Sequence, residues 1–127
     1  MNRRLIAAAL IALPIAGCAT FGGNGLSGQY GGEHVILNLG PNGGTMELDC
    51  ANATLGAVAP RGDGSFTTRG TYSRGMGAVG GRRAVPATFS GLADPNTIRV
   101  RIDLADGTHV GPLKLDRGTR PTLYKCY

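Results

Sequence analysis

The 127-residue chain contains no tryptophan and only two histidines, and charged residues make up 17% of it. Its long apolar stretch, residues 5–15, is shorter than the roughly 20 residues that a membrane-spanning helix needs. After the first four residues the basic side chains are scattered, with Arg82 and Arg83 as the one adjacent pair. Nucleic-acid-binding proteins usually show a dense basic stripe. These shortages argue against a transmembrane helix and against nucleic acid as a partner.

The first 18 residues are typical of a bacterial export signal. Arg3 and Arg4 give a positive start, and residues 5–15 give a short apolar stretch. The segment ends in Ile-Ala-Gly-Cys at residues 15–18, which resembles the lipobox of bacterial lipoproteins. The resemblance implies cleavage before Cys18 and attachment of diacylglycerol, with acyl chains such as palmitate, to its sulfur. The alternative is an ordinary signal peptide in which Cys18 occurs by chance.

This interpretation divides the chain into three parts. We expect a signal peptide at residues 1–17, a lipidated flexible tether at residues 18–27 and a single domain at residues 28–127. Loss of the two leader arginines reduces the formal net charge from +5 to +3. Two or more acyl chains give stable membrane attachment. Ala19 stands where lipoproteins retained at the inner membrane tend to carry Asp, and this favours an outer-membrane anchor facing the periplasm.

The two cysteines that remain, Cys50 and Cys126, predict a disulfide, because the count is even and the predicted compartment is oxidising. Such a bond closes a long loop, for which chain entropy gives a stabilisation of about 4 kcal/mol. A metal site is a poor alternative, because His34 and His109 have no ligand spacing with either cysteine. A catalytic thiol is poorer still outside a reducing compartment.

Alternation of apolar and polar residues dominates the domain, and its 22 glycines, counted over the whole chain, suit turns rather than helices. Turn signals lie at residues 40–44, 61–64, 94–96 and 106–107. We therefore predict an all-β fold, an antiparallel meander barrel of about eight strands, with a two-sheet sandwich as the alternative. The alternating runs place strands near residues 35–39, 46–50, 66–72, 85–91, 98–104, 113–115 and 122–127.

Short segments resemble a group of small exported bacterial proteins that have no assigned activity. The matching pieces are residues 31–35, 48–51, 70–72 and 123–126. Gly28-Gln29-Tyr30 is also similar to the Gly-x-Trp start of lipocalins, with Tyr in place of Trp. The resemblance implies a lipocalin-like barrel shape and supplies no reaction.

No cluster of residues predicts catalysis. Residues 75–80 match G-x-G-x-x-G, but an alternating run follows them where a dinucleotide site needs a helix, so a flexible hairpin loop is favoured. Glu33 and His34 are expected at the start of a strand, where neighbours point to opposite faces. His109 follows a turn and is expected at the surface or in a capping role. We therefore predict a non-enzyme without cofactor or metal.

Two functions fit this pattern. We favour a structural or protein-interaction module of the cell envelope, with a filled core and an exposed patch around Tyr30 and residues 75–83. The alternative is a lipocalin-like binder of a small apolar ligand. Such a carrier needs an interior cavity. The residues expected to line that cavity are Phe66, Phe89, Ile98 and Val100.

Overall fold

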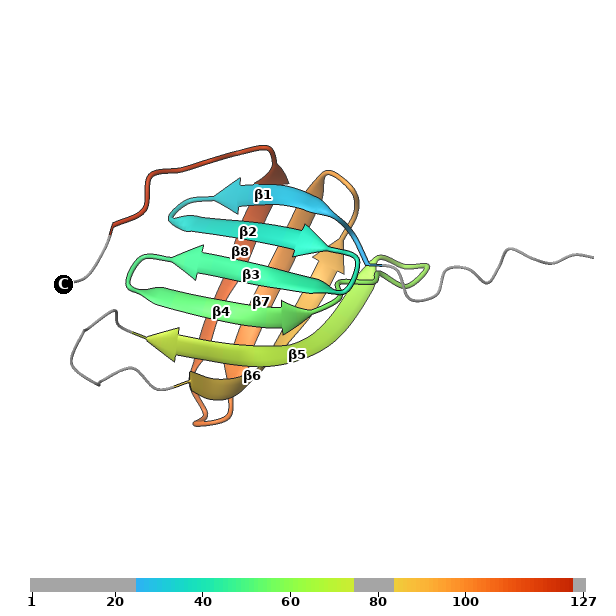
Figure 1. The fold of residues 1–127 in the computed structure, drawn as a ribbon. Coiled ribbons are helices and arrows are strands. Elements are labelled where there is room, and N and C mark those ends of the chain that lie inside the picture. The colour runs from blue at the N-terminus through green and yellow to red at the C-terminus, as the bar shows by residue number, and fades with distance from the viewer. Residues whose placement is uncertain (1–24, 75–83, 125–127) are drawn as a thin grey trace, which may run out of the picture.

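The computed structural model describes residues 25–74 and 84–124, in which eight antiparallel strands close into one barrel (Figure 1). Each strand pairs with its neighbours in sequence, and the first strand pairs with the last. The all-β meander barrel is therefore confirmed. Within the described ranges, no helix has the length and apolar character needed to cross a membrane. The strands are β1 (Gly28–Gly32), β2 (Val35–Gly40), β3 (Gly43–Leu48), β4 (Ala51–Gly56), β5 (Ser65–Arg74), β6 (Ala84–Ala93), β7 (Thr97–Leu104) and β8 (His109–Arg117).

The barrel interior is filled by apolar side chains from every strand. Alternate residues of a strand point to opposite faces, so Ile98 and Ile102 of β7 are fully buried while Arg99 and Arg101 are exposed. The buried side chains form one continuous cluster. Its largest members are Tyr30, Phe89, Leu37, Met46, Ile98, Ile102, Leu115, Val35, Val58 and Val100.

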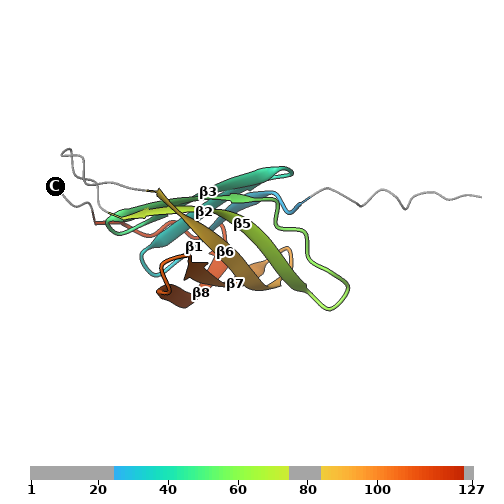
Figure 2. The same cartoon turned by 90° about the horizontal axis from the view of Figure 1, so that it is seen from below.

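The barrel is built from two layers of strands that cross at an angle. In Figure 1, β1 to β4 run across the front and β6 to β8 run behind them, and Figure 2 shows the layers from the side. The long strand β5 joins the layers. It pairs with β6 from Ser65 to Ser73, but its pairing with β4 stops at Gly70. Gly70 is therefore the point where β5 leaves β4.

A glycine is required there by the approach of the neighbouring backbone. A Cβ atom added at Gly70 would meet the carbonyl oxygen of Thr54 and would lie 2.7 Å from the Cα of Leu55. Both are backbone atoms of β4, so the strand itself would have to move. Glycine inside a strand commonly marks such a bend or close approach.

We expect Gly70→Ala to lower the free energy of unfolding by about 1–3 kcal/mol, as overpacking does. Gly62→Ala is the matched control, because an added Cβ there meets nothing within 4 Å. Urea denaturation of both variants measures the difference. Equal stability of the two variants would show that β4 and β5 can move apart at Gly70 to accept a methyl group without loss of stability.

The closure between β1 and β8 is short and depends on Tyr30 and Arg117. Only two residue pairs join these strands, Tyr30 with Arg117 and Gly31 with Asp116. The Arg117 guanidinium lies 4.9 Å from the centre of the Tyr30 ring, and its Nη2 donates to the Tyr30 hydroxyl at 2.7 Å. Arg117 Nε and the Tyr30 hydroxyl both donate to the carbonyl of Pro95, at 2.7 and 3.0 Å. A buried ring thus links β1, β8 and the β6–β7 turn.

Burial raises the pKa of Tyr30 above its usual range, although the charge of Arg117 opposes the rise. The folded state therefore holds this proton at a pH where the unfolded state has released it. The neutral Tyr30 hydroxyl therefore makes its full contribution to the free energy of unfolding below the ordinary tyrosine pKa of about 10. That contribution is lost as the pH rises through the pKa of Tyr30 in the folded state.

We expect Tyr30→Phe to cost about 1–2 kcal/mol at neutral pH, because the hydrogen bonds of the hydroxyl are lost. The variant should also lose less stability than the wild type between about pH 9 and pH 11. Tyr72→Phe serves for comparison, since burial also raises the pKa of Tyr72. Urea midpoints across this range test the expectation, and an unchanged alkaline decline in Tyr30→Phe would contradict it.

The strands differ from the prediction in four places. β1 and β4 were not predicted, because GQYGG and ANATLG are rich in small residues and show little apolar contrast. The predicted strand at residues 46–50 ends at Leu48, since Asp49 and Cys50 form the turn to β4. The predicted final strand at residues 122–127 is wrong for residues 122–124, which are not in a strand. β8 is the last strand, and residues 125–127 lie outside the described range.

Candidate functional site

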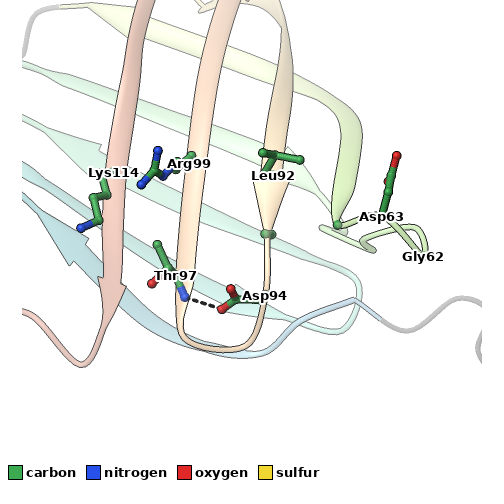
Figure 3. A pocket seen from close by; sticks show the side chains of 9 residues that line it. Gly62, Asp63, Leu92, Asp94, Thr97, Arg99 and Lys114 are labelled. Atoms are coloured by element: carbon green, nitrogen blue, oxygen red, sulfur yellow. Dashed lines mark hydrogen bonds between the residues drawn. The ribbon is translucent and has the colours of Figure 1, made fainter.

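A groove on the outer wall of the barrel has a volume of about 650 Å³. It lies over the outer faces of β6, β7 and β8, beside the loop between β4 and β5 (Figure 3). We call it the outer groove. It is lined by Gly62, Asp63, Gly64, Leu92, Ala93, Asp94, Thr97, Arg99 and Lys114.

Strand register places two cations and one leucine side by side in this groove. Leu92 of β6 is directly opposite Arg99 of β7, and Arg99 is directly opposite Lys114 of β8. Directly opposite residues share a face, and like charges in that position destabilise a sheet. The ion pairs within residues 25–74 and 84–124 join other side chains. Arg99 and Lys114 are therefore a like-charge pair, and neither has an ion-pair partner among the described residues.

The two carboxylates on the groove rim, Asp63 and Asp94, accept hydrogen bonds from residues of the turns in which they lie. Asp94 Oδ1 accepts hydrogen bonds from the backbone N–H groups of Asn96 and Thr97, at 2.8 and 2.9 Å. Asp63 Oδ1 accepts from the hydroxyl and backbone N–H of Ser65, at 2.6 and 2.9 Å. The Ser65 hydroxyl and backbone bonds hold the pKa of Asp63 below its usual range. Asp63 therefore remains ionised at neutral pH.

A second depression, of about 290 Å³, lies on the outer side of β5, β6 and β7 and includes Arg69, Pro86 and Asp103. Asp103 Oδ1 accepts a hydrogen bond from Arg101 Nε at 3.0 Å. The Asp103 charge is therefore paired, whereas Arg99 and Lys114 of the outer groove form no ion pair within the described residues.

The C-terminal tail, residues 118–124, runs from the end of β8 along β1 (Figure 1). Gly118 N–H donates to the carbonyl of Gln29 at 2.8 Å, and Gln29 Nε2 donates to the carbonyl of Thr119 at 2.6 Å. The backbone N–H of Tyr124 then donates to Asp49 Oδ1 at 2.7 Å. The tail is thus bound at both ends of its path.

Asp49 also joins two turns of the barrel. His34 Nδ1 lies 2.9 Å from Asp49 Oδ2, and the His34 and Tyr124 rings are 5.4 Å apart. His34 and Cys50 are the second residues of equivalent two-residue turns, and both have left-handed φ angles, 62° and 61°. Such angles are costly outside glycine and persist where surrounding contacts impose them. The contacts of His34 are those that bind the tail.

Of the three cysteines, Cys50 alone lies within the described residues. Cys50 is disulfide-bonded. Cys126 and Cys18 both lie outside the described residues, so the Cys50–Cys126 pairing and the lipidation of Cys18 stay predictions. The G-x-G-x-x-G segment at residues 75–80 and most of the expected tether also lie outside them.

The positions of four further groups of residues can be compared with the expectations from the sequence. Glu33 and His34 form the turn between β1 and β2 and do not start a strand, so that expectation was wrong. Tyr30 is fully buried, so it cannot contribute to the expected exposed patch. His109 is exposed at the start of β8, opposite Asp103. The four residues proposed to line a cavity belong to the packed core.

Sequence reasoning missed the outer groove, although alternation in β7 indicated that Arg99 points outward. Leu92 and Lys114 lie on other strands, and their register with Arg99 depends on the turn lengths between them. The described part of the chain contains no group of three or more histidine, cysteine, aspartate or glutamate residues able to hold a metal ion. Comparisons with protein-family models, with curated proteins and with solved structures find no match to this chain.

We expect Asp49→Ala to release the end of the tail, because the variant removes the acceptor for the Tyr124 amide and the partner of His34. Hydrogen exchange at the Tyr124 amide should become about fivefold faster, as loss of a bond of roughly 1 kcal/mol implies. Global stability should fall by less than about 1 kcal/mol, since the pair is exposed.

Asp106→Ala is the matched control for this measurement. Asp106 binds Thr108 within its own turn and pairs with Arg74, away from the tail contacts. Exchange at Tyr124 should therefore be unchanged. An unaltered Tyr124 exchange rate in Asp49→Ala would contradict the role of Asp49.

Proposed function

We propose that the protein is a lipid-anchored module of the bacterial cell envelope that binds another envelope protein through the outer wall of its barrel. The anchoring half of this proposal rests on the leader, with its two arginines, short apolar stretch and Ile-Ala-Gly-Cys ending at Cys18. Stable attachment needs more than one acyl chain, which the expected diacylglycerol supplies.

The binding half is supported above all by the filled interior. A lipocalin-like carrier holds its ligand inside the barrel, where Phe66, Phe89, Ile98 and Val100 would line the cavity. These side chains are 0–3% exposed and belong to one packed cluster. Small eight-stranded barrels are often filled in this way by their own side chains. Among the described residues, we therefore favour the outer wall, with the outer groove, as the surface for recognition.

Catalysis finds less support in the described residues. The pair that most resembles an acid–base couple is His34 with Asp49 at 2.9 Å, but the His34 side chain is 47% exposed. Both residues are also engaged by the C-terminal tail. Neither depression described above includes them. We therefore assign the pair to holding the tail and propose no reaction.

The first described residues, Gly25 and Leu26, lie at the same end of the barrel as the outer groove. Gly25 and Leu26 donate to the carbonyls of Pro41 and Val58, which belong to the β2–β3 turn and the β4–β5 loop. The groove is bordered by that same loop and by the β6–β7 turn. An anchor at Cys18 would keep the whole domain near the membrane. Partners at or near the membrane surface are therefore favoured.

The experiment compares the wild type with Cys18→Ala in bacterial cells. The wild type should incorporate labelled palmitate and fractionate with membranes, and Cys18→Ala should lose both properties because the acylated sulfur is gone. Photo-reactive residues at three outward positions, 67, 92 and 101, should give discrete cross-links to an envelope protein in the anchored form. Continued labelling of Cys18→Ala would refute the anchor, and absence of cross-links from all three positions would refute the interaction.

A further inference from the structure

We infer that the outer groove binds an extended peptide segment of the partner protein, in which an apolar residue is followed two positions later by an acidic one. This inference deepens the proposed function and rests on it. It names the chemistry that the partner presents and the three side chains that recognise it, Leu92, Arg99 and Lys114.

The acidic residue is required by the two opposed cations. Arg99 and Lys114 are directly opposite on neighbouring strands, and both are exposed. Asp63 and Asp94 are on the rim of the same groove but accept hydrogen bonds from Ser65 and from the β6–β7 turn. A carboxylate placed between the two cations would convert a repulsion into two attractions. The arginine fork also suits carboxylate geometry.

The apolar residue is required by Leu92. Its side chain is 54% exposed, one of two large hydrophobic residues exposed to this extent in the described chain, and it lies directly beside Arg99. Figure 3 shows Leu92, Arg99 and Lys114 along successive strands of the groove wall. An isolated exposed leucine needs no explanation, but this one forms the apolar end of a concave, charged site. Covering it would remove apolar surface from water.

The spacing of these side chains fits an extended peptide that crosses the strands. Neighbouring strands are about 4.8 Å apart, so Leu92 and Lys114 are separated by roughly 10 Å, with Arg99 between them. In an extended peptide, residues i and i+2 point to one side and are about 7 Å apart. A residue at i on Leu92 therefore places residue i+2 between Arg99 and Lys114.

Charge distribution favours a peptide over an anionic membrane surface. A flat anionic surface that approached Arg99 and Lys114 would also meet the rim carboxylates of Asp63 and Asp94, and it would not enter a concave groove. The Asp63 carboxylate stays charged at neutral pH, since the bonds of Ser65 lower its pKa. A peptide carries its negative charge at one point and avoids this repulsion.

The test uses the purified full chain in detergent micelles and a fluorescein-labelled peptide, Gly-Leu-Ser-Glu-Ser-Leu-Ser-Glu-Gly. Fluorescence polarisation gives its Kd for the wild type, for Arg99→Glu, for Lys114→Glu and for Leu92→Ser. We expect each charge reversal to raise the Kd about tenfold or more, as expected for a rim charge contact that becomes repulsive. Leu92→Ser should raise it by a smaller factor.

Matched controls separate the groove from general charge effects. Arg69→Glu makes the same charge change at an exposed position on β5 outside the outer groove and should leave the Kd unchanged. A peptide with lysine in place of glutamate should not bind the wild type but should bind Arg99→Glu/Lys114→Glu. Folding is checked by thermal melting, in which Arg99→Glu should melt at or above the wild-type temperature because it replaces a like-charge pair.

Three outcomes would overturn the inference: no binding to the wild type, equal loss in Arg69→Glu, or equal binding of the lysine peptide. Phosphatidylglycerol vesicles added as competitor give a fourth. If the vesicles bind the wild type and displace the peptide, and if Arg99→Glu no longer binds the vesicles, the groove would be reassigned to a lipid surface. Failure here would leave palmitate labelling and cross-linking intact. Loss of those two properties with peptide binding retained would instead refute the proposed function.

Discussion

The contact between Tyr30 and Arg117 is the interaction on which the closed barrel depends. β1 and β8 share only two residue pairs, so their backbone pairing is short compared with the nine pairs that join β5 and β6. The Arg117 guanidinium compensates by reaching the Tyr30 ring and the carbonyls of Pro95 and Ser27. It thereby joins Ser27, which precedes β1, to the last strand and to the β6–β7 turn that borders the outer groove.

Closure and filling together determine which surfaces the described part of the barrel exposes. A closed barrel has no long free sheet edge to offer, and the interior is occupied by a single apolar cluster. The outer wall then carries an ion pair at Arg101 and Asp103, and a like-charge pair at Arg99 and Lys114. Arg101 and Asp103 lie two residues apart on β7, whereas Arg99 of β7 lies opposite Lys114 of β8.

The C-terminal tail makes further contacts with the same barrel. It runs along β1, the strand with the weakest pairing, and ends at Asp49 between two hairpin turns. The left-handed φ angles of His34 and Cys50 lie at these turns. A strained turn and a bound tail are consistent with each other, because the tail contacts of His34 favour the strained conformation over its relaxed alternatives.

Sequence alone determined the barrel class and the inward residues of β2, β6 and β7, because alternation of apolar and polar side chains depends only on the two-residue period of a strand. It did not reveal β1 and β4, whose small residues carry no such contrast and whose pairing is imposed by their neighbours. Nor did it reveal the outer groove. Which outward side chains stand opposite one another depends on turn lengths and register, and these are decided only when all eight strands close.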